Sequence, residues 1–225
     1  MEPVIHHSWN LSYAQAASLQ TELSAKVRAR GNAARARRIA GVDVAISPDK
    51  RQLVAAVVVL DKHLHTIERR FAVAETKFPY VPGYLSFREG PVVMAALAKL
   101  QEPADLLIFD GQGWAHPRRL GLASHIGLLS NTPSIGAAKS RLIGEHGRLG
   151  LRKGAVTPLL DGGEQIGTVV RTRRAVRPIY VSVGHRISLD AAVKWVLRCS
   201  PQYRVPEPTR SADHWVGELK KAQFA

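Results

Sequence analysis

A run of eight residues at 53–60, with the sequence LVAAVVVL, is apolar from end to end. A strand that leaves one face in water alternates apolar and polar residues, whereas a strand buried on both faces reads as a continuous apolar run. The run therefore predicts a central strand covered on both faces. Strand-like runs at 39–46 and 66–73 are joined to it by short connections, so we expect the three to form an antiparallel meander.

Helix and strand patterns alternate through the rest of the chain. We expect helices at about 12–27, from 91 onward, at 120–129, 189–197 and 212–221, and strands at 106–109, 134–137, 166–171 and 179–183. This order predicts an α/β fold, with a central mixed β-sheet flanked by helices on both faces. No repeat or linker interrupts it, so we expect residues 1–225 to form a single domain.

The charge of the chain is strongly positive. Among 225 residues, 32 Lys and Arg face 18 Asp and Glu, which gives a formal net charge of +14. Such an excess is typical of proteins that bind a polyanion, most often nucleic acid. Basic residues gather at 26–38, 139–153 and 171–177. Each cluster is either part of a phosphate-binding surface or an ordinary solvated face.

Cysteine content and hydropathy exclude several classes of protein. Cys199 is the only cysteine, which excludes an internal disulfide framework and a multi-cysteine zinc site. Cysteine poverty also suits a reducing compartment. No apolar run reaches the roughly 18 residues of a membrane span, and the first residues lack a signal-peptide pattern. We therefore expect a cytoplasmic protein without a membrane partner.

Three acidic residues lie in or beside apolar segments, where a charged carboxylate is costly to desolvate. Asp43 lies inside an apolar strand, Asp110 closes another, and Glu89 lies between a Pro/Gly loop and the expected helix start. Desolvating a carboxylate costs free energy unless a cation compensates it. A shared Mg²⁺ ion would do so, because Mg²⁺ prefers oxygen ligands and substrate phosphates. The alternatives are salt bridges with arginines, a turn at Asp110, and a helix-terminal role for Glu89.

Two further segments carry chemical signals. The first, DGQGWAHPRRLGLASHIG at 110–127, combines glycines with His116 and His125. Its glycines permit close approach of a base or phosphate, or are ordinary turn glycines. His116 precedes a proline and is expected in a loop facing the site, whereas His125 is expected to pack in the core.

The second segment is FPYVPGYLSFREG at 78–90. Pro79 and Pro82 stiffen the loop that carries Tyr80. A rigid aromatic side chain can separate stacked bases, so Tyr80 is a candidate wedge. The alternative is that Tyr80 packs the loop onto the core.

Taken together, six motifs resemble those of the endonuclease V family, the deoxyinosine-specific nucleases. They are VDVAIS, PYVPGYLSFREGP, LIFDGQGWAHPRRLGLASHIGL, PSIGAAKSRL, GHRISLDAA and YRVPEPTRSAD. The resemblance as a whole extends from about Leu11 to about Asp213. The resemblance implies a ribonuclease H-like fold. It also implies a DNA repair endonuclease that nicks the second phosphodiester bond 3′ to deoxyinosine, leaving a 3′-hydroxyl and a 5′-phosphate.

The resemblance also implies roles for individual residues. The metal ligands would be Asp43, Glu89 and Asp110, holding Mg²⁺ with Mn²⁺ able to substitute. Lys139 would lie near the scissile phosphate and His116 near the metal, both in catalytic roles. The lesion would be met by Tyr80, Pro82, Gly83, Leu85, Gly111, Gly113, Gly121 and Leu122. Asp213 would lie near the active site, with His214 a weaker candidate.

Two positions depart from the family pattern. Tyr84 replaces a leucine often found after PYVPG, which adds an aromatic ring beside the base pocket, and Ile46 stands where tyrosine or phenylalanine is common. The partner is expected to be DNA containing deoxyinosine, single-stranded substrates included, bound by a monomer. Two alternatives remain open: an inosine-specific endoribonuclease acting on RNA, and a non-catalytic nucleic-acid-binding protein.

Overall fold

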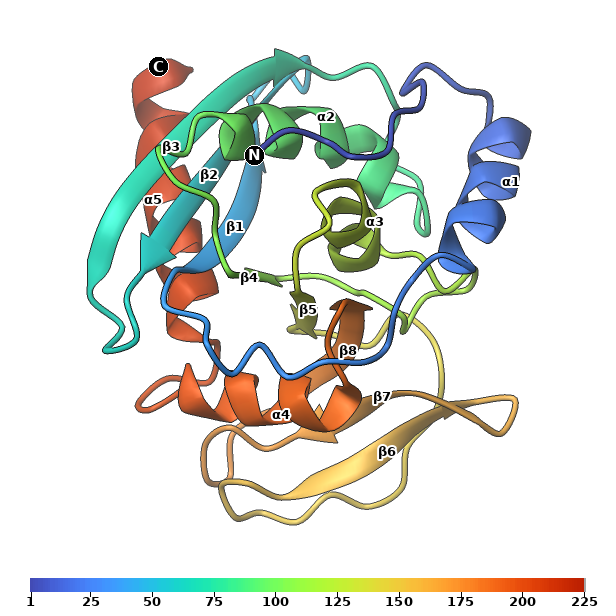
Figure 1. Cartoon of the computed structure of the whole chain (residues 1–225), viewed down its shortest axis with the longest axis vertical. Helices are drawn as coiled ribbons and strands as arrows, with labels where there is room; N and C mark the ends of the chain where they lie inside the picture. Colours follow the sequence, from blue (N-terminus) through green and yellow to red (C-terminus); the bar gives the residue numbers. More distant parts are fainter. Residues whose placement is uncertain (225) are drawn as a thin grey trace.

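The computed structural model describes residues 1–224 and is built around one eight-stranded sheet (Figure 1). The strand order is β3-β2-β1-β4-β5-β8-β7-β6. The strands are β1 (Ile39–Ile46), β2 (Gln52–Leu60), β3 (Thr66–Glu75), β4 (Leu106–Phe109), β5 (Ser134–Ala138), β6 (Val156–Asp161), β7 (Glu164–Val170) and β8 (Ile179–His185). Strands β1, β4 and β5 run parallel, and the other pairs are antiparallel. The predicted mixed sheet and its leading meander are confirmed.

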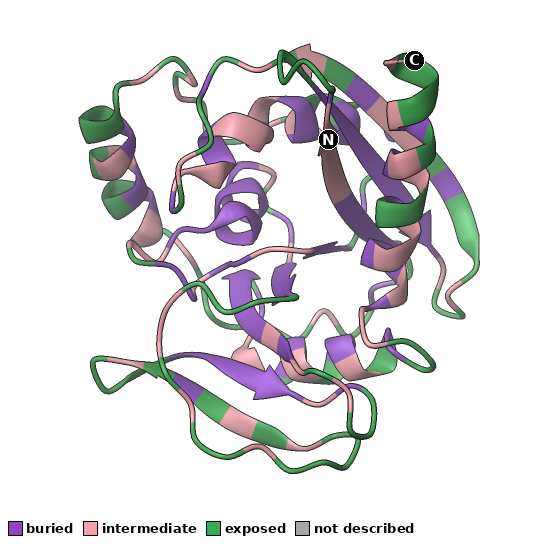
Figure 2. Cartoon of the chain, turned by 180° about the vertical axis from the view of Figure 1, so that it is seen from behind, coloured by how far each residue is buried: buried purple, intermediate pink, exposed green. Residues whose placement is uncertain are grey.

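Helices cover both faces of this sheet. Helices α2 (Leu85–Ala98) and α3 (Leu122–Leu129) pack on one face, with α1 (Tyr13–Ser24) beyond α3. Helices α4 (Leu189–Arg198) and α5 (Glu207–Gln223) pack on the other. In β2, Val57 packs toward α2 and Val54 toward α5. The apolar run is thus buried on both sides, as Figure 2 shows for the central strands.

Helix α2 begins at Leu85, six residues before the expected start at Pro91. Proline lacks the N–H that a helix interior needs, so it is normally placed at the first turn. Here Ser86, Phe87 and Gly90 are buried, and this packing holds the turn before the proline in helical form. Glu89 therefore lies within a helix, and its predicted place before a helix start was wrong.

Helix α5 and strand β6 also differ from the sequence expectation. Helix α5 begins at Glu207, immediately after Pro206, rather than at 212. Strand β6 was not predicted at all. It is one of the two edge strands of the sheet, it contains Pro158, and of its six residues only Leu159 is buried. An edge strand with a proline lacks both the apolar pattern and the full ladder of hydrogen bonds that mark a strand.

Among residues 1–224, no helix has the length and hydropathy needed to cross a bilayer.

Contact between β1 and α5 depends on Gly41. A Cβ atom at this position would lie 2.0 Å from the carbonyl carbon and oxygen of Pro208, so the helix backbone rests directly on the strand. This close approach brings the next turn of α5, with Asp213, over the strand that carries Asp43.

We expect Gly41→Ala to destabilise the protein by about 3 kcal/mol, because the added methyl group forces sheet and helix apart. Gly217→Ala is the matched control, since a Cβ there meets no atom within 4 Å and alanine favours the helix by up to about 1 kcal/mol. Urea unfolding of both variants measures the difference. Equal midpoints for the two would contradict the assigned contact.

Candidate functional site

Two of the predicted carboxylates are neighbours because of strand register. Strands β1 and β4 are parallel, and their last paired residues are Val42 and Phe109. Asp43 and Asp110 follow these residues directly, so both carboxylates lie at the same place across adjacent strands. Both side chains are half-buried.

The third carboxylate reaches the same place from a helix. Glu89 lies three residues after Ser86 and four before Val93, both of which are buried. Residues at this spacing share one helical face, so Glu89 faces the sheet. Its charge acts on both Asp43 and Asp110. The structure thus brings the three predicted acidic residues together.

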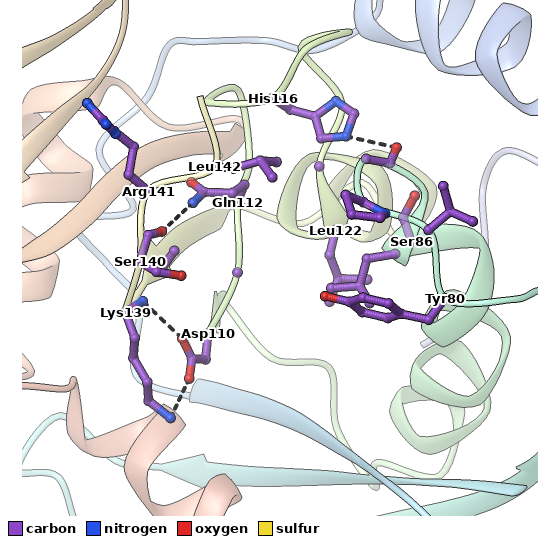
Figure 3. A pocket seen from close by; sticks show the side chains of 17 residues that line it. Tyr80, Ser86, Asp110, Gln112, His116, Leu122, Lys139, Ser140, Arg141 and Leu142 are labelled. Atoms are coloured by element: carbon purple, nitrogen blue, oxygen red, sulfur yellow. Dashed lines mark hydrogen bonds and ion pairs between the residues drawn. The ribbon is translucent and has the colours of Figure 1, made fainter. Parts of the chain in front are cut away.

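A cation and a fourth carboxylate complete the cluster. Lys139 follows β5, and its Nζ lies 2.6 Å from Oδ2 of Asp110 and 3.8 Å from Oδ1 of Asp213. Its backbone N–H also donates to Oδ1 of Asp110 at 3.3 Å. Arg204 donates to the carbonyl oxygens of Lys139 and Pro178, which ties the loop after β5 to the start of β8. Figure 3 shows the Asp110–Lys139 pair at one side of the pocket.

Burial and the charges of neighbouring groups shift the pKa values of the clustered side chains. Burial, with the carboxylates of Asp213 and Asp110 nearby, raises the pKa of Asp43 to about 7. Burial and the charges of Asp43 and Asp110 raise the pKa of Glu89 to about 8. Although partial burial opposes it, contact with Asp110 raises the pKa of Lys139. Ionisation of Asp43 and Glu89 is therefore disfavoured, and the single ammonium group of Lys139 does not offset this effect.

The donor set fits a hard divalent cation. All the clustered ligand atoms are carboxylate oxygens, which Mg²⁺ and Mn²⁺ prefer. As the side chains stand within residues 1–224, no group of three or more His, Cys, Asp or Glu side chains is arranged to hold an ion. The ammonium of Lys139 lies directly against Asp110 instead. Metal binding would require the carboxylates to turn away from Lys139 and toward the ion.

A cavity of about 360 Å³ adjoins the carboxylate cluster. Most of the predicted lesion-contacting and catalytic residues line it: Tyr80, Pro82, Gly83, Leu85, Gly111, Gly121, Leu122, Asp110, His116 and Lys139. Asp43, Glu89 and Gly113 do not. A Cβ on Gly113 would lie 2.1 Å from the carbonyl oxygen of Val183, so this glycine permits packing against β8.

One carbonyl group anchors the loop that carries Tyr80. The oxygen of Gly83 accepts three hydrogen bonds, from Nε2 of His116 at 3.0 Å, Nη2 of Arg118 at 2.8 Å and Nε2 of Gln20 at 3.1 Å. Gly83 has φ of +82°, a conformation that favours glycine. The side chain of Gln20 also donates to the carbonyl of Leu120, and it accepts from Nε of Arg118. The buried Gln20 thus connects the two loops that line the cavity.

Hydrogen bonding determines which ring nitrogen of His116 carries the proton. Its Nδ1 accepts the backbone N–H of Arg118, so Nε2 carries the proton donated to Gly83. Burial and the nearby Arg118 and Arg119 lower the pKa of His116 to about 4, which keeps the ring neutral. Both ring nitrogens are engaged with protein groups. Its expected catalytic role stays a prediction, and these contacts favour a role in holding the Gly83 loop.

Tyr80 and Tyr84 differ sharply in exposure and contacts. Tyr80 is 70% exposed at the cavity mouth, with Arg88 on its ring at 6.0 Å. Tyr84 does not line the cavity; it stacks on Phe78 and carries the Arg118 guanidinium at 4.4 Å. The ring of Tyr84 therefore supports the Gly83 loop from behind and leaves the cavity free.

The sequence did not single out Gln20 or Arg118. Gln20 has no local signal, because its partners are 63 and 100 residues away. Arg118 lies in the HPRR motif, where a basic residue near glycines gave a partial signal. His125 is fully buried, as expected, with its Nε2 2.8 Å from that of His7.

The strand order, with one carboxylate within β1 and one directly after β4, is that of the ribonuclease H-like class of α/β proteins. A family model for endonuclease V matches residues 21–214. Endonuclease V from Gloeobacter violaceus is 48% identical over 221 residues, 96% of this chain and 90% of the relative. The chain belongs to the endonuclease V family, whose members nick DNA 3′ to deoxyinosine and are generally metal-dependent.

Solved structures agree with this assignment. Endonuclease V from Streptomyces avermitilis superposes with a TM-score of 0.93 at 42% identity, covering 100% of both chains. Endonuclease V from Ciona intestinalis, solved with a 24mer DNA containing an inosine followed by a ribo-adenosine, gives 0.81 at 30% identity, covering 93% of this chain and 98% of that one.

We expect Gln20→Leu to weaken affinity for an inosine-containing duplex about tenfold, or ~1.4 kcal/mol, because Nε of Arg118 loses its acceptor and the two cavity loops lose the link through Gln20. Thr21→Val, on the exposed face of the same helix, is the control. Fluorescence anisotropy without divalent metal measures affinity, and thermal unfolding measures stability. A loss of stability with unchanged affinity would contradict a positioning role.

Proposed function

We propose that this chain is a metal-dependent DNA repair endonuclease that nicks the second phosphodiester bond 3′ to deoxyinosine and leaves a 3′-hydroxyl and a 5′-phosphate. The observation that carries the proposal is the convergence of Asp43, Glu89 and Asp110 beside Lys139 at the edge of a cavity. Buried carboxylates in a chain of net charge +14 are explained if a cation and a phosphate meet there. In this proposal residues 1–225 act as one domain and as a monomer.

The cavity supplies the place for the lesion. Its volume of about 360 Å³ is within the range of small-ligand sites. Enzymes that act at a modified base commonly flip it out of the helix, and a mispaired base costs less to unstack. Gly83, Gly111 and Gly121 line the cavity, where the absence of side chains allows the flipped base to approach the backbone. Tyr80, exposed and held between prolines, would fill the gap left in the stack.

The roles of the charged residues follow from their positions. Asp43, Glu89 and Asp110 would hold Mg²⁺ or Mn²⁺, which when bound supplies Lewis-acid polarisation of the scissile phosphate. Lys139 is placed to stabilise negative charge that develops on the phosphate oxygens. Asp213, 3.8 Å from Nζ of Lys139, keeps that ammonium group oriented toward the cluster. Glu89, which approaches from α2, would either hold the ion or orient the attacking water.

The nature of the nucleic acid is the finer part of the proposal. Ciona intestinalis endonuclease V is solved with DNA in which a ribo-adenosine follows the inosine. We expect DNA to be cut because the chain belongs to the endonuclease V family, and parallel cleavage of matched inosine substrates in DNA and in RNA decides which of the two is preferred. A cytoplasmic location is proposed as well, because the lone Cys199 is buried and free.

We expect the wild-type protein to nick a duplex with a single deoxyinosine only when Mg²⁺ is added. Asp110→Asn should lower the nicking rate by a factor on the order of 10³, because it removes a ligand charge while keeping the side chain's shape. The same variant should lose the rise in melting temperature that saturating Mg²⁺ gives the wild type. Gel analysis of end-labelled strands locates the cut and thermal unfolding reports metal binding.

Asp190→Asn is the control, since that carboxylate is exposed on α4. Wild-type nicking that persists in EDTA, or that persists at full rate in Asp110→Asn, would overturn the metal assignment. Cleavage of the RNA substrate but not of the DNA substrate would show that the endoribonuclease alternative is correct.

We expect Tyr80→Ala to weaken binding of an inosine duplex by about tenfold, since loss of a stacking ring costs about 1–3 kcal/mol. Tyr80→Phe should bind as the wild type does, because the ring remains. Anisotropy in EDTA measures affinity without cleavage. The wedge role is ruled out if alanine and phenylalanine variants bind equally.

A further inference from the structure

A second group of cations lies near the amino end of β1, at the opposite end of that strand from the carboxylate cluster. The chain entering β1 carries Arg35 and Arg37, the β2–β3 turn carries Lys62, and the last turn of α4 carries Arg198. Together with Ala34 and Ala36, these four cations line one open hollow of about 630 Å³, which we call the amino-edge hollow. In Figure 1 the three segments meet at the lower left, at the amino end of β1.

The four cations are exposed and form no ion pair with the carboxylates of residues 1–224. Their neighbour Arg38 differs, because it pairs with Glu68 and Glu102. Two acidic residues lie next to these segments: the Asp105 carboxylate accepts the backbone N–H groups of Arg37 and Arg38, and the Asp61 carboxylate accepts those of His63 and His65 in the β2–β3 turn. Because none of the four cations has an ion-pair partner among the described residues, they repel each other, and an anionic ligand would relieve this repulsion.

The hollow is also partly ordered in advance. Arg198 lies over the Trp195 ring at 4.7 Å and donates to the carbonyl of Lys62 at 3.2 Å. Small side chains at Ala34 and Ala36 keep its floor open. A helix C-terminus favours a basic residue, which accounts for Arg198 alone but not for the other three.

The amino-edge hollow is separate from the carboxylate cluster. Asp43 is the fifth residue of β1, about 13 Å along the strand from Ile39, and Arg37 lies beyond Ile39 in the opposite direction. The basic cluster 26–38 therefore does not line the cavity that would hold the lesion, whereas Lys139 and Arg141 do. The sequence could not distinguish these two surfaces.

We propose that the amino-edge hollow is a second, non-catalytic DNA site that binds the phosphate backbone of a segment other than the one in the cavity. Its ligand is double-stranded DNA without sequence preference, because the lysine and arginine side chains of the hollow can contact phosphate groups but present no surface that reads base edges. This proposal rests on the proposed function for the identity of the polyanion. Such a site would keep the enzyme on undamaged DNA while the cavity samples bases.

The test asks whether two duplexes bind at once. The full-length protein is saturated in EDTA with a short inosine duplex, and a labelled undamaged duplex is then titrated at several salt concentrations. We expect the second duplex to bind without displacing the first. In Arg35→Gln/Arg37→Gln/Lys62→Gln its affinity should fall at least tenfold, and the salt slope should drop by about 2 to 3, because each phosphate contact contributes about 0.9.

Arg69→Gln/Lys220→Gln/Lys221→Gln removes equal charge from β3 and α5 and is the matched control. Displacement of the inosine duplex, or an equal loss in the control, would overturn the proposal. Tighter binding of poly-glutamate than of DNA would overturn it in favour of an acidic protein partner. These outcomes do not depend on nicking, so they are distinct from a failure of the proposed function.

Discussion

Parallel pairing between β1 and β4 determines where the chemistry of this protein is located. The register that joins Val42 to Phe109 places Asp43 and Asp110 side by side, and the rest of the cluster is built around them. Glu89 approaches from α2 on one face of the sheet and Asp213 from α5 on the other. The second approach needs Gly41, because any larger residue would hold α5 away from the strand. A sheet, two helices and one glycine thus concentrate four carboxylates in one place.

This concentration has an electrostatic cost that explains the site's character. Raised pKa values at Asp43 and Glu89 mean that their ionised forms are disfavoured in the folded protein. Stability linked to these groups is present below their ordinary pKa values and falls as pH rises toward 7 and 8. The protein bears this cost although its net charge is +14. A divalent cation relieves the cost more fully than Lys139 does, which is the physical reason for expecting metal dependence.

The sequence predicted what depends on local pattern and missed what depends on distant contact. The run at 53–60 and the short strand before Asp110 are readable because apolar period and strand-end position are local properties. The predicted start of α2 was wrong because the burial of Phe87 and Gly90 outweighs the preference of Pro91 for a first turn. The convergence of Asp43, Glu89 and Asp110 followed from family resemblance, since no spacing rule gives a parallel register. Gln20 was invisible for the same reason, as its partners are set by tertiary structure.

The departure at Tyr84 shows how the chain supports its cavity. Its ring stacks on Phe78 and under Arg118, and Arg118 donates to the Gly83 carbonyl together with Gln20 and His116. Three donors on one carbonyl hold a positive-φ glycine in a single conformation, so the loop is ordered before substrate arrives. Ordering a loop on binding reduces affinity, whereas a loop ordered beforehand avoids that loss. The ring of Tyr84 therefore contributes to the preorganisation of the cavity, while Tyr80, from the same loop, remains exposed.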